Sequence, residues 1–272
     1  MALRKILITV KIYPGFSTRE EEVIYAAGVE EDGTWVRIAP LRFERRCYAN
    51  QYRKYHWIEM DLVRDRSDQR RESYRPKRRG TPVRILEEVN QNNNWELRKK
   101  IALQNVYVGM NRLLADAKSG NRALSLATFK PARIVNFFWE ETTREWSDRQ
   151  QRWLEQWNLM ERTNGMLRPI RKLPYLFSYT IEDINGNEST LMIDDWDVGR
   201  FFWDRLQHRN QDEQAALQDV RNRYFNEFIR DRDVYFFLNT VRISHFSARN
   251  PFFIVGTFHP MKEQQLSFDF GS

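Results

Sequence analysis

Apolar and polar residues alternate along five short segments within the first ninety positions. The clearest, residues 4–13, places the β-branched residues Ile6, Ile8, Val10 and Ile12 at every second position, which is the spacing of a half-buried strand. Similar patterns cover residues 22–29, 34–39, 56–63 and 82–89. Asp32-Gly33 between the second and third segments is typical of a hairpin turn. Five short strands without a long helix among them predict a small antiparallel sheet or barrel.

The pattern changes after the polar run at residues 90–94. Apolar residues then share one helical face from 95 to 117, with a break near Gly109, and the pattern ends at residues 119–121. Strands are predicted over residues 124–139, 174–182, 189–194, 233–243 and 251–258, and helices from near 143, over 198–206 and over 212–229. This order predicts an α+β protein with two β-rich halves joined by helices, residues 1–120 and 121–272.

The composition excludes several classes of protein. Among 272 residues, 41% are hydrophobic and 14% aromatic, too many for a disordered chain even with 30% charged residues. The single cysteine, Cys47, cannot form an intramolecular disulfide or a thiolate zinc site, which favours a cytoplasmic location. No window approaches 18 uncharged apolar residues, so no membrane span is predicted.

Most of the excess positive charge lies in one short segment. Residues 64–84 hold nine basic and three acidic side chains, a net charge of +6 within a chain of net charge +7. Arginine predominates, and its planar guanidinium suits phosphate contacts. The candidate phosphate ligands are Arg70, Arg71, Arg75, Arg78 and Arg79. The alternative is a mobile basic loop whose arginines pair with acidic neighbours.

Aromatic side chains accompany this basic segment and a second basic segment at residues 37–54. Tyr74 and Tyr52 are candidates for stacking on bases, because single-strand binders combine cations with exposed rings. Tyr48 and Tyr55 also lie between predicted strands and could be exposed. Three tryptophans of the helix from near 143 fit a core face or a stacking platform, and Trp35 and Trp57 lie in predicted strands that favour the core.

Catalytic motifs are scarce in this sequence. It contains no Walker loop, GxGxxG, HExxH or GxSxG motif. Asp194 and Asp195 at a strand end, together with His245, are the candidates for a catalytic site, and Mg²⁺ would be required only if they act on a scissile phosphate. The alternative is that Asp195 caps the helix that begins near Val198.

The last residues carry a candidate docking motif. Gln265 and Leu266 are followed by Phe268 and Phe270. This tail resembles the short motif by which bacterial replication proteins dock on the sliding clamp, with the two phenylalanines in place of the usual leucines. An extended peptide could insert these side chains into an apolar pocket of a partner. The alternative is a final strand that packs on the core.

Six segments together resemble a known group of sequences. They are residues 11–29, 35–43, 52–62, 70–76, 191–199 and 251–260. In these the chain resembles a family of uncharacterised prokaryotic dual OB-fold-containing proteins. The resemblance implies two OB-like antiparallel barrels and a nucleic-acid-related role within mobile or phage-defence gene clusters. It supplies no catalytic residue.

The leading hypothesis is a cytoplasmic, non-catalytic nucleic-acid-binding protein. One form of this hypothesis is an accessory or sensor component of a prokaryotic defence or DNA-processing system. Its partner would be DNA or RNA, with a protein partner at the C-terminal tail and no membrane. One alternative is a metal-dependent nucleic-acid-processing enzyme. Another is an accessory subunit that docks on a partner enzyme.

Overall fold

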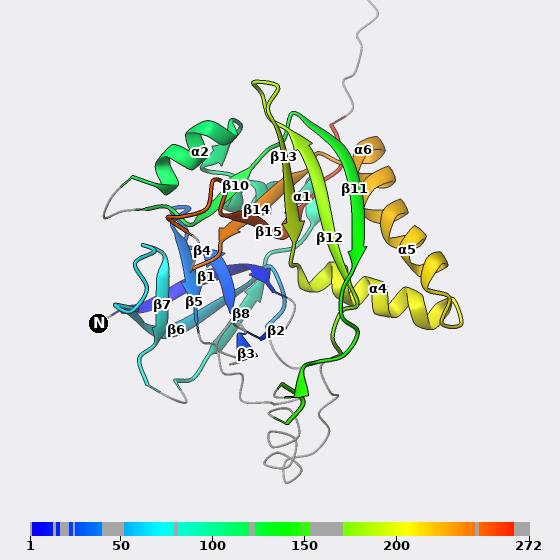
Figure 1. The fold of residues 1–272 in the computed structure, drawn as a ribbon. Coiled ribbons are helices and arrows are strands. Elements are labelled where there is room, and N and C mark those ends of the chain that lie inside the picture. Colours follow the sequence, from blue (N-terminus) through cyan, green and yellow to red (C-terminus); the bar gives the residue numbers. More distant parts are fainter. Residues whose placement is uncertain are drawn as a thin grey trace, which may run out of the picture.

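The computed structural model describes residues 2–12, 15–16, 22–23, 25–39, 52–78, 81–119, 123–148, 150–152, 171–242 and 245–263. It contains two β-rich halves, each with its own main sheet, and helices between and around them (Figure 1). The predicted α+β class is confirmed. The domain boundary at residue 120 stays a prediction.

The first half is a closed five-stranded barrel. Its strands are β1 (Ala2–Lys11), β4 (Ala26–Val29), β5 (Trp35–Ile38), β6 (His56–Arg64) and β7 (Ser73–Pro76). They follow the order β1-β4-β5-β7-β6, and β6 pairs back with β1 to close the barrel. β5 and β7 are parallel, whereas the other neighbours are antiparallel. The result is an OB-like barrel. Strand β8 (Arg84–Glu88) extends it at β6, and β2 (Gly15–Phe16) pairs with β3 (Glu22–Val23) separately.

The second half repeats this strand order in an open sheet. Its strands are β9 (Val106–Tyr107), β10 (Leu126–Phe129), β11 (Arg133–Glu141), β12 (Tyr175–Glu182), β13 (Glu188–Ile193), β14 (Tyr235–Thr240) and β15 (Phe252–Phe258). The central order β11-β12-β13-β15-β14 matches that of the barrel, including a parallel pairing of the third and fifth strands. A closed barrel would need β11 to pair with β14. Instead β10 pairs with that edge of β14, and β9 pairs with β10.

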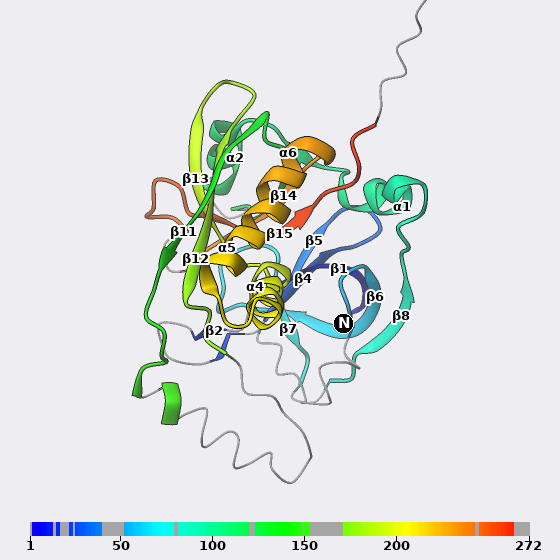
Figure 2. The same cartoon turned by 90° about the vertical axis from the view of Figure 1, so that its right-hand side faces the viewer.

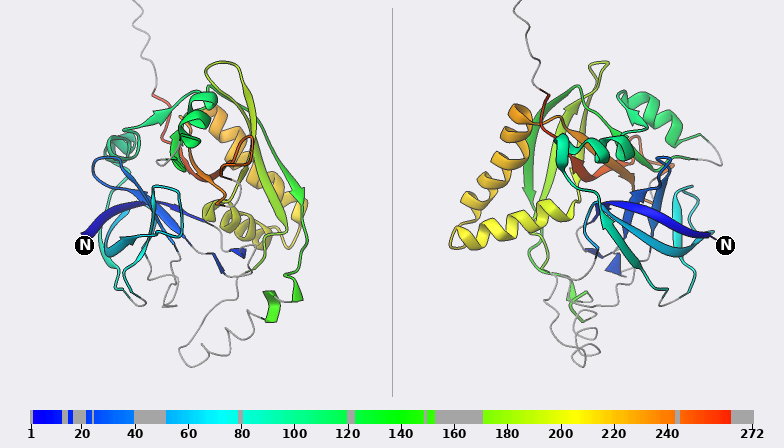
Figure 3. Two further views of the ribbon diagram at one scale, coloured as in Figure 1. Left: turned by 60° about the vertical axis from the view of Figure 1, so that its left-hand side comes forward. Right: turned by 180° about the vertical axis from the view of Figure 1, so that it is seen from behind.

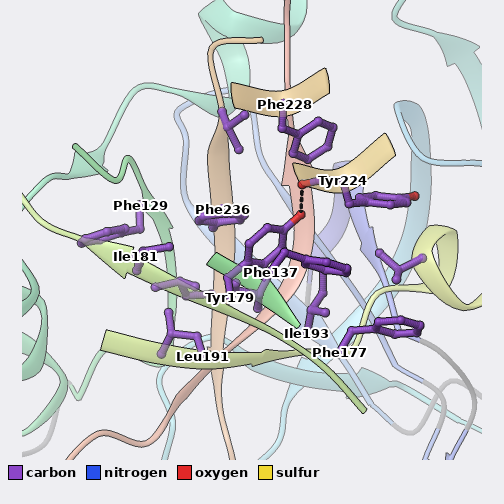
Figure 4. Close-up of a cluster of buried hydrophobic side chains, with 14 of the residues drawn as sticks. Phe129, Phe137, Phe177, Tyr179, Ile181, Leu191, Ile193, Tyr224, Phe228 and Phe236 are labelled. Atoms are coloured by element: carbon purple, nitrogen blue, oxygen red, sulfur yellow. Dashed lines mark hydrogen bonds between the residues drawn. The ribbon is translucent and has the colours of Figure 1, made fainter. Parts of the chain in front are cut away.

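Helices connect the two halves and cover the second sheet. They are α1 (Asn92–Ala102), α2 (Met110–Ala117), α4 (Trp196–His208), α5 (Glu213–Arg221), the π-helix η4 (Asn222–Asn226) and α6 (Glu227–Asp231). Figure 2 shows α4, α5 and α6 along one side of strands β11–β13. They enclose an aromatic core in which the Tyr179 hydroxyl donates a hydrogen bond to the Tyr224 carbonyl at 2.6 Å (Figure 4).

Strands β4, β5 and most of β1 are buried on both sides, whereas β6 and β7 also carry partly exposed residues. Ile6 and Ile8 of β1 pack inside the barrel, whereas Leu7 and Val10 pack in a cluster shared with the second half. Trp35 meets Phe237 of β14 there with ring centroids 5.4 Å apart. The predicted core positions of Trp35 and Trp57 are confirmed, since they are 9% and 5% exposed. The halves therefore share one continuous hydrophobic contact.

The predicted elements are largely present, and the structure differs from the prediction over residues 124–139 and at β7. The expected helix over residues 95–117 is broken as predicted, because Gly109 is the N-cap of α2 and β9 precedes it. The predicted strand over residues 124–139 is two strands, β10 and β11. Strand β7 was not predicted, because the sequence there indicates a basic loop. It closes the barrel between β5 and β6.

Candidate nucleic-acid interface

Arg64, at the end of β6, holds the backbone of the loop over residues 65–72 by hydrogen bonds from its side chain. Its guanidinium donates hydrogen bonds at 2.7–3.2 Å to four backbone carbonyl oxygens, those of Asp65, Asp68, Arg70 and Ser73. Five donors in a fixed planar arrangement make arginine suited to satisfying several carbonyls at once. The conformation of this loop is therefore set by one of the basic residues of the segment itself.

Arg70 lies buried between the two halves. Its Nε and Nη2 donate to the Asp68 carboxylate at 3.0 and 2.7 Å, and its Nη1 donates to the Thr240 carbonyl of β14 at 2.6 Å. Burial opposes ionisation of Asp68, but the hydrogen bonds from Arg70 and Ser73 hold its pKa below its ordinary value. Arg70 joins the halves and is only 8% exposed, which corrects its predicted place among the phosphate-binding residues.

Arg37 of β5 forms a second buried link between the halves. Its Nη1 donates to Ser73 Oγ at 2.7 Å, and its Nη2 donates to Ser125 Oγ at 2.8 Å and to Asn239 Oδ1. The Glu72 carboxylate accepts hydrogen bonds from the Ser125 backbone N–H at 3.1 Å and from its hydroxyl at 2.7 Å. Burial and the neighbouring Arg70 lower the pKa of Arg37 to about 10, so it stays charged at neutral pH. These contacts hold the two halves in one arrangement.

Five cations beside this junction are exposed, and we call them the basic set: Arg66, Arg71, Arg75, Lys77 and Arg78. Arg71 lies 3.2 Å from the buried Glu72, and Lys77 lies 3.7 Å from Asp61. The other three form no ion pair with any residue that the structure describes. The sequence alternative of a loop neutralised by acidic neighbours therefore does not apply to them. Arg79 lies outside the described residues.

Neither of the two tyrosines predicted to stack on bases, Tyr52 and Tyr74, is exposed. Tyr52 is only 3% exposed, and the Lys11 ammonium lies 5.3 Å from its ring centroid. Tyr74 is half-buried, its ring is covered by the Arg4 guanidinium at 4.2 Å, and its hydroxyl accepts a hydrogen bond from Arg4. Tyr55 is also buried, and Tyr48 lies outside the described residues. The prediction that Tyr52 and Tyr55 are exposed was wrong.

Asp195 has the capping role that the sequence suggested as its alternative. It is the N-cap of α4 and accepts a hydrogen bond from the Asp197 backbone N–H at 3.1 Å. The Lys54 ammonium donates to Asp195 at 2.5 Å and to Asp197 at 2.7 Å. Burial raises the pKa of Asp195 to about 6 even beside this cation. Its carboxylate is thus engaged in helix capping and an ion pair.

The other two catalytic candidates lie in different surroundings. Asp194 is half-buried, and its backbone N–H donates to the Ile254 carbonyl at 2.8 Å. His245 is buried near Arg70, and its Nδ1 lies 2.8 Å from Thr240 Oγ1. Burial and Arg70 lower its pKa below the ordinary histidine value. Within the part of the chain that the structure describes, no group of three or more His, Cys, Asp or Glu residues could hold a metal ion.

Two further expectations concern the ends and the surroundings of the chain. The candidate docking residues Gln265, Leu266, Phe268 and Phe270 lie outside the described residues. Among the helices that the structure describes, none combines the length and the apolar character needed to cross a bilayer.

The loop over residues 241–250, between β14 and β15, contributes residues that the sequence did not assign to an interface. Arg242 donates a hydrogen bond to the Ser67 carbonyl in the loop that carries Arg66. The left panel of Figure 3 brings this side of the molecule forward. Arg242, Phe246 and Arg249 are all exposed. A phenylalanine among Arg, Ser and Asn residues between two apolar strands was the available clue.

These observations define a two-part α+β protein in which an OB-like barrel and an open sheet of the same strand order are locked together beside exposed cations. Residues 106–270, more than half of the chain, match the family described as Domain of unknown function (DUF8757), and the chain belongs to that family. Residues 2–104 match the family described as Domain of unknown function (DUF8758).

Two solved structures align along nearly the whole chain at low similarity. One is described as a murine DNA binding protein bound with ds DNA, at 8% identity and a TM-score of 0.34, covering 97% of each chain. The other is the tetrameric p202 HIN2, at 8% identity and a TM-score of 0.31, covering 96% of this chain and 92% of that one. Superpositions this loose establish no shared function. No curated protein matches the chain.

Proposed function

We propose that the protein binds nucleic acid through the basic set. The observation that carries this proposal is that Arg66, Arg75 and Arg78 are exposed and form no ion pair with any described residue. Exposed guanidinium groups that no carboxylate neutralises attract phosphate. Phosphate contacts supply most of the affinity of non-specific nucleic-acid binding.

The buried residues Arg70 and Glu72 and the half-buried Arg64 support the same proposal. These residues fix the loop and β7 from inside, so the exposed cations are presented on a structured backbone. A preorganised set loses less conformational entropy when it binds than a mobile loop would. The proposal concerns binding alone and assigns no reaction to the protein.

The test compares two variants with the same change of charge. In the first, Arg66, Arg75 and Arg78 are replaced by Gln. In the control, Arg200, Arg209 and Arg230 are replaced by Gln, which are exposed on the helices of the second half and have acidic partners. Binding of labelled single-stranded and duplex DNA and RNA is followed by fluorescence anisotropy.

The basic-set variant should bind at least about tenfold more weakly than the wild type in moderate salt, because up to three phosphate contacts are lost. The control should stay close to the wild type. Equal weakening in both variants would mean that overall charge, and not this set, determines binding. Melting temperatures within a few degrees of the wild type would show that both variants fold.

A further inference from the structure

Residues 241–242 and 245–250, between β14 and β15, are held by contacts to other parts of the molecule. Arg242 bonds to the Ser67 carbonyl, and the Lys118 ammonium, just after α2, lies 3.4 Å from the Arg249 carbonyl. At the base of the loop, Arg70 bonds to the Thr240 carbonyl at 2.6 Å. The loop therefore belongs to the same surface as the 65–72 loop, although the two are far apart in the sequence.

Phe246 projects from this loop into solvent. Phe246 is 50% exposed, and among the aromatic residues whose burial the structure describes it is the only one that is exposed. Its ring meets that of His245 edge to face, with centroids 4.5 Å apart. His245 is itself buried and held by Thr240. The phenyl ring is thus supported by a buried neighbour, while half of the residue's surface is exposed to solvent.

The charges around Phe246 favour a polyanion as its partner. Arg242 and Arg249 are exposed on the same loop, and Arg66 is exposed in the loop that Arg242 contacts. An aromatic ring flanked by cations is the combination by which proteins hold single strands, with bases stacked on rings and phosphates paired with cations. A duplex offers no free base surface to such a ring unless its base pairs are opened.

We propose that Phe246 stacks on an unpaired base of a single-stranded nucleic acid whose phosphates contact Arg242 and the basic set. This proposal rests on the proposed nucleic-acid binding and names the form of the ligand. Phe246 takes the stacking role that the sequence suggested for Tyr52 and Tyr74. A base laid on Phe246 would bury the exposed part of the ring and place its neighbouring phosphates near the arginines.

The experiment uses the full chain with Phe246→Ala, Phe246→Trp and the control Val241→Ala, an exposed apolar residue of the same loop. The probes are a labelled single-stranded oligonucleotide and the duplex of the same sequence. Phe246→Ala should weaken single-strand binding by about 5-fold to 150-fold, the usual range for loss of one base–aromatic stack. Phe246→Trp should retain binding, and Val241→Ala should match the wild type on both probes.

A second readout tests stacking itself. An oligonucleotide carrying 2-aminopurine should show fluorescence quenching on binding to the wild type and to Phe246→Trp, and less quenching on Phe246→Ala. Unchanged single-strand affinity in Phe246→Ala would overturn the stacking role while leaving the proposed function intact if the basic-set variant still loses binding. Equal loss on the duplex would overturn the assignment to an unpaired base. Absence of binding to any probe by the wild type would refute both proposals.

Discussion

Replacement of Arg37 by Met tests how strongly the buried polar network joins the two halves. The substitution keeps an unbranched side chain but removes three charge-assisted hydrogen bonds, to Ser73, Ser125 and Asn239. It also removes a buried positive charge that interacts electrostatically with the carboxylates of Glu72 and Asp68. Breaking a buried charged network by removing one partner typically costs about 3–5 kcal/mol, since bonds to charged groups contribute about 1.5–3 kcal/mol each and part of the desolvation cost is recovered.

This loss is large enough to be measured simply. For 272 residues the unfolding entropy near the melting temperature is about 0.6 kcal/mol/K, so the melting temperature should fall by about 5–9 °C. Urea denaturation followed by tryptophan fluorescence measures the free energy of unfolding. The matched control is Arg75→Met, an exposed arginine of β7, which should change that free energy by less than about 0.5 kcal/mol. If Arg37→Met unfolds within about 1 kcal/mol of the wild type, the network does not hold the halves together.

Two further predictions concern the barrel and its dependence on pH. A Cβ atom at Gly28 would lie 2.0 Å from the Leu7 carbonyl oxygen and 2.8 Å from Ile6 Cγ2. Gly28→Ala should therefore lower the free energy of unfolding in urea by about 3 kcal/mol or more. A stability close to that of the wild type would mean that β1 and β4 can move apart without cost. The folded-state pKa of Asp68 lies below its ordinary value, so its contribution to stability is complete above the unfolded pKa of about 3.9 and is lost as the pH falls below it. Asp68→Asn should therefore have a lower free energy of unfolding than the wild type at pH 7, and this difference should be smaller near pH 3. A difference of the same size at both pH values would contradict the assigned ion pair between Asp68 and Arg70.

The sequence predicted the parts of the fold that depend on apolar alternation. β1, β14 and β15 have strong apolar patterns because most of their residues are buried, in the barrel, in the second core or between the halves. β6 has one because its buried residues alternate with partly exposed ones. β7 escaped prediction because the groups that bury it are polar. Ser73 bonds to Arg37 and Asp68, and Arg75 on the same strand is exposed. Periodicity of hydrophobic residues cannot identify such a strand.

The candidate site was predicted as a segment but not as individual residues. Arg70 and Arg75 are indistinguishable in a basic run, yet one is bonded to Asp68 and Thr240 and the other is exposed. The difference depends on β14, about 170 positions away along the chain. Phe246 was not considered because the hydrogen bond from Arg242 to the Ser67 carbonyl, which brings the two loops together, forms only when the two halves pack.

The salt dependence of binding tests the central proposal most directly. Single-strand and duplex affinities of the wild type and of the basic-set variant are measured between about 50 and 200 mM salt. The wild type should bind with an affinity that falls linearly in a plot of log K against log salt concentration. Loss of three phosphate contacts should make the slope of the variant shallower by about 2 on single strands and by about 2.7 on duplex. Parallel lines for the two proteins, or an affinity of the wild type that does not change with salt, would contradict a role for these arginines in binding nucleic acid.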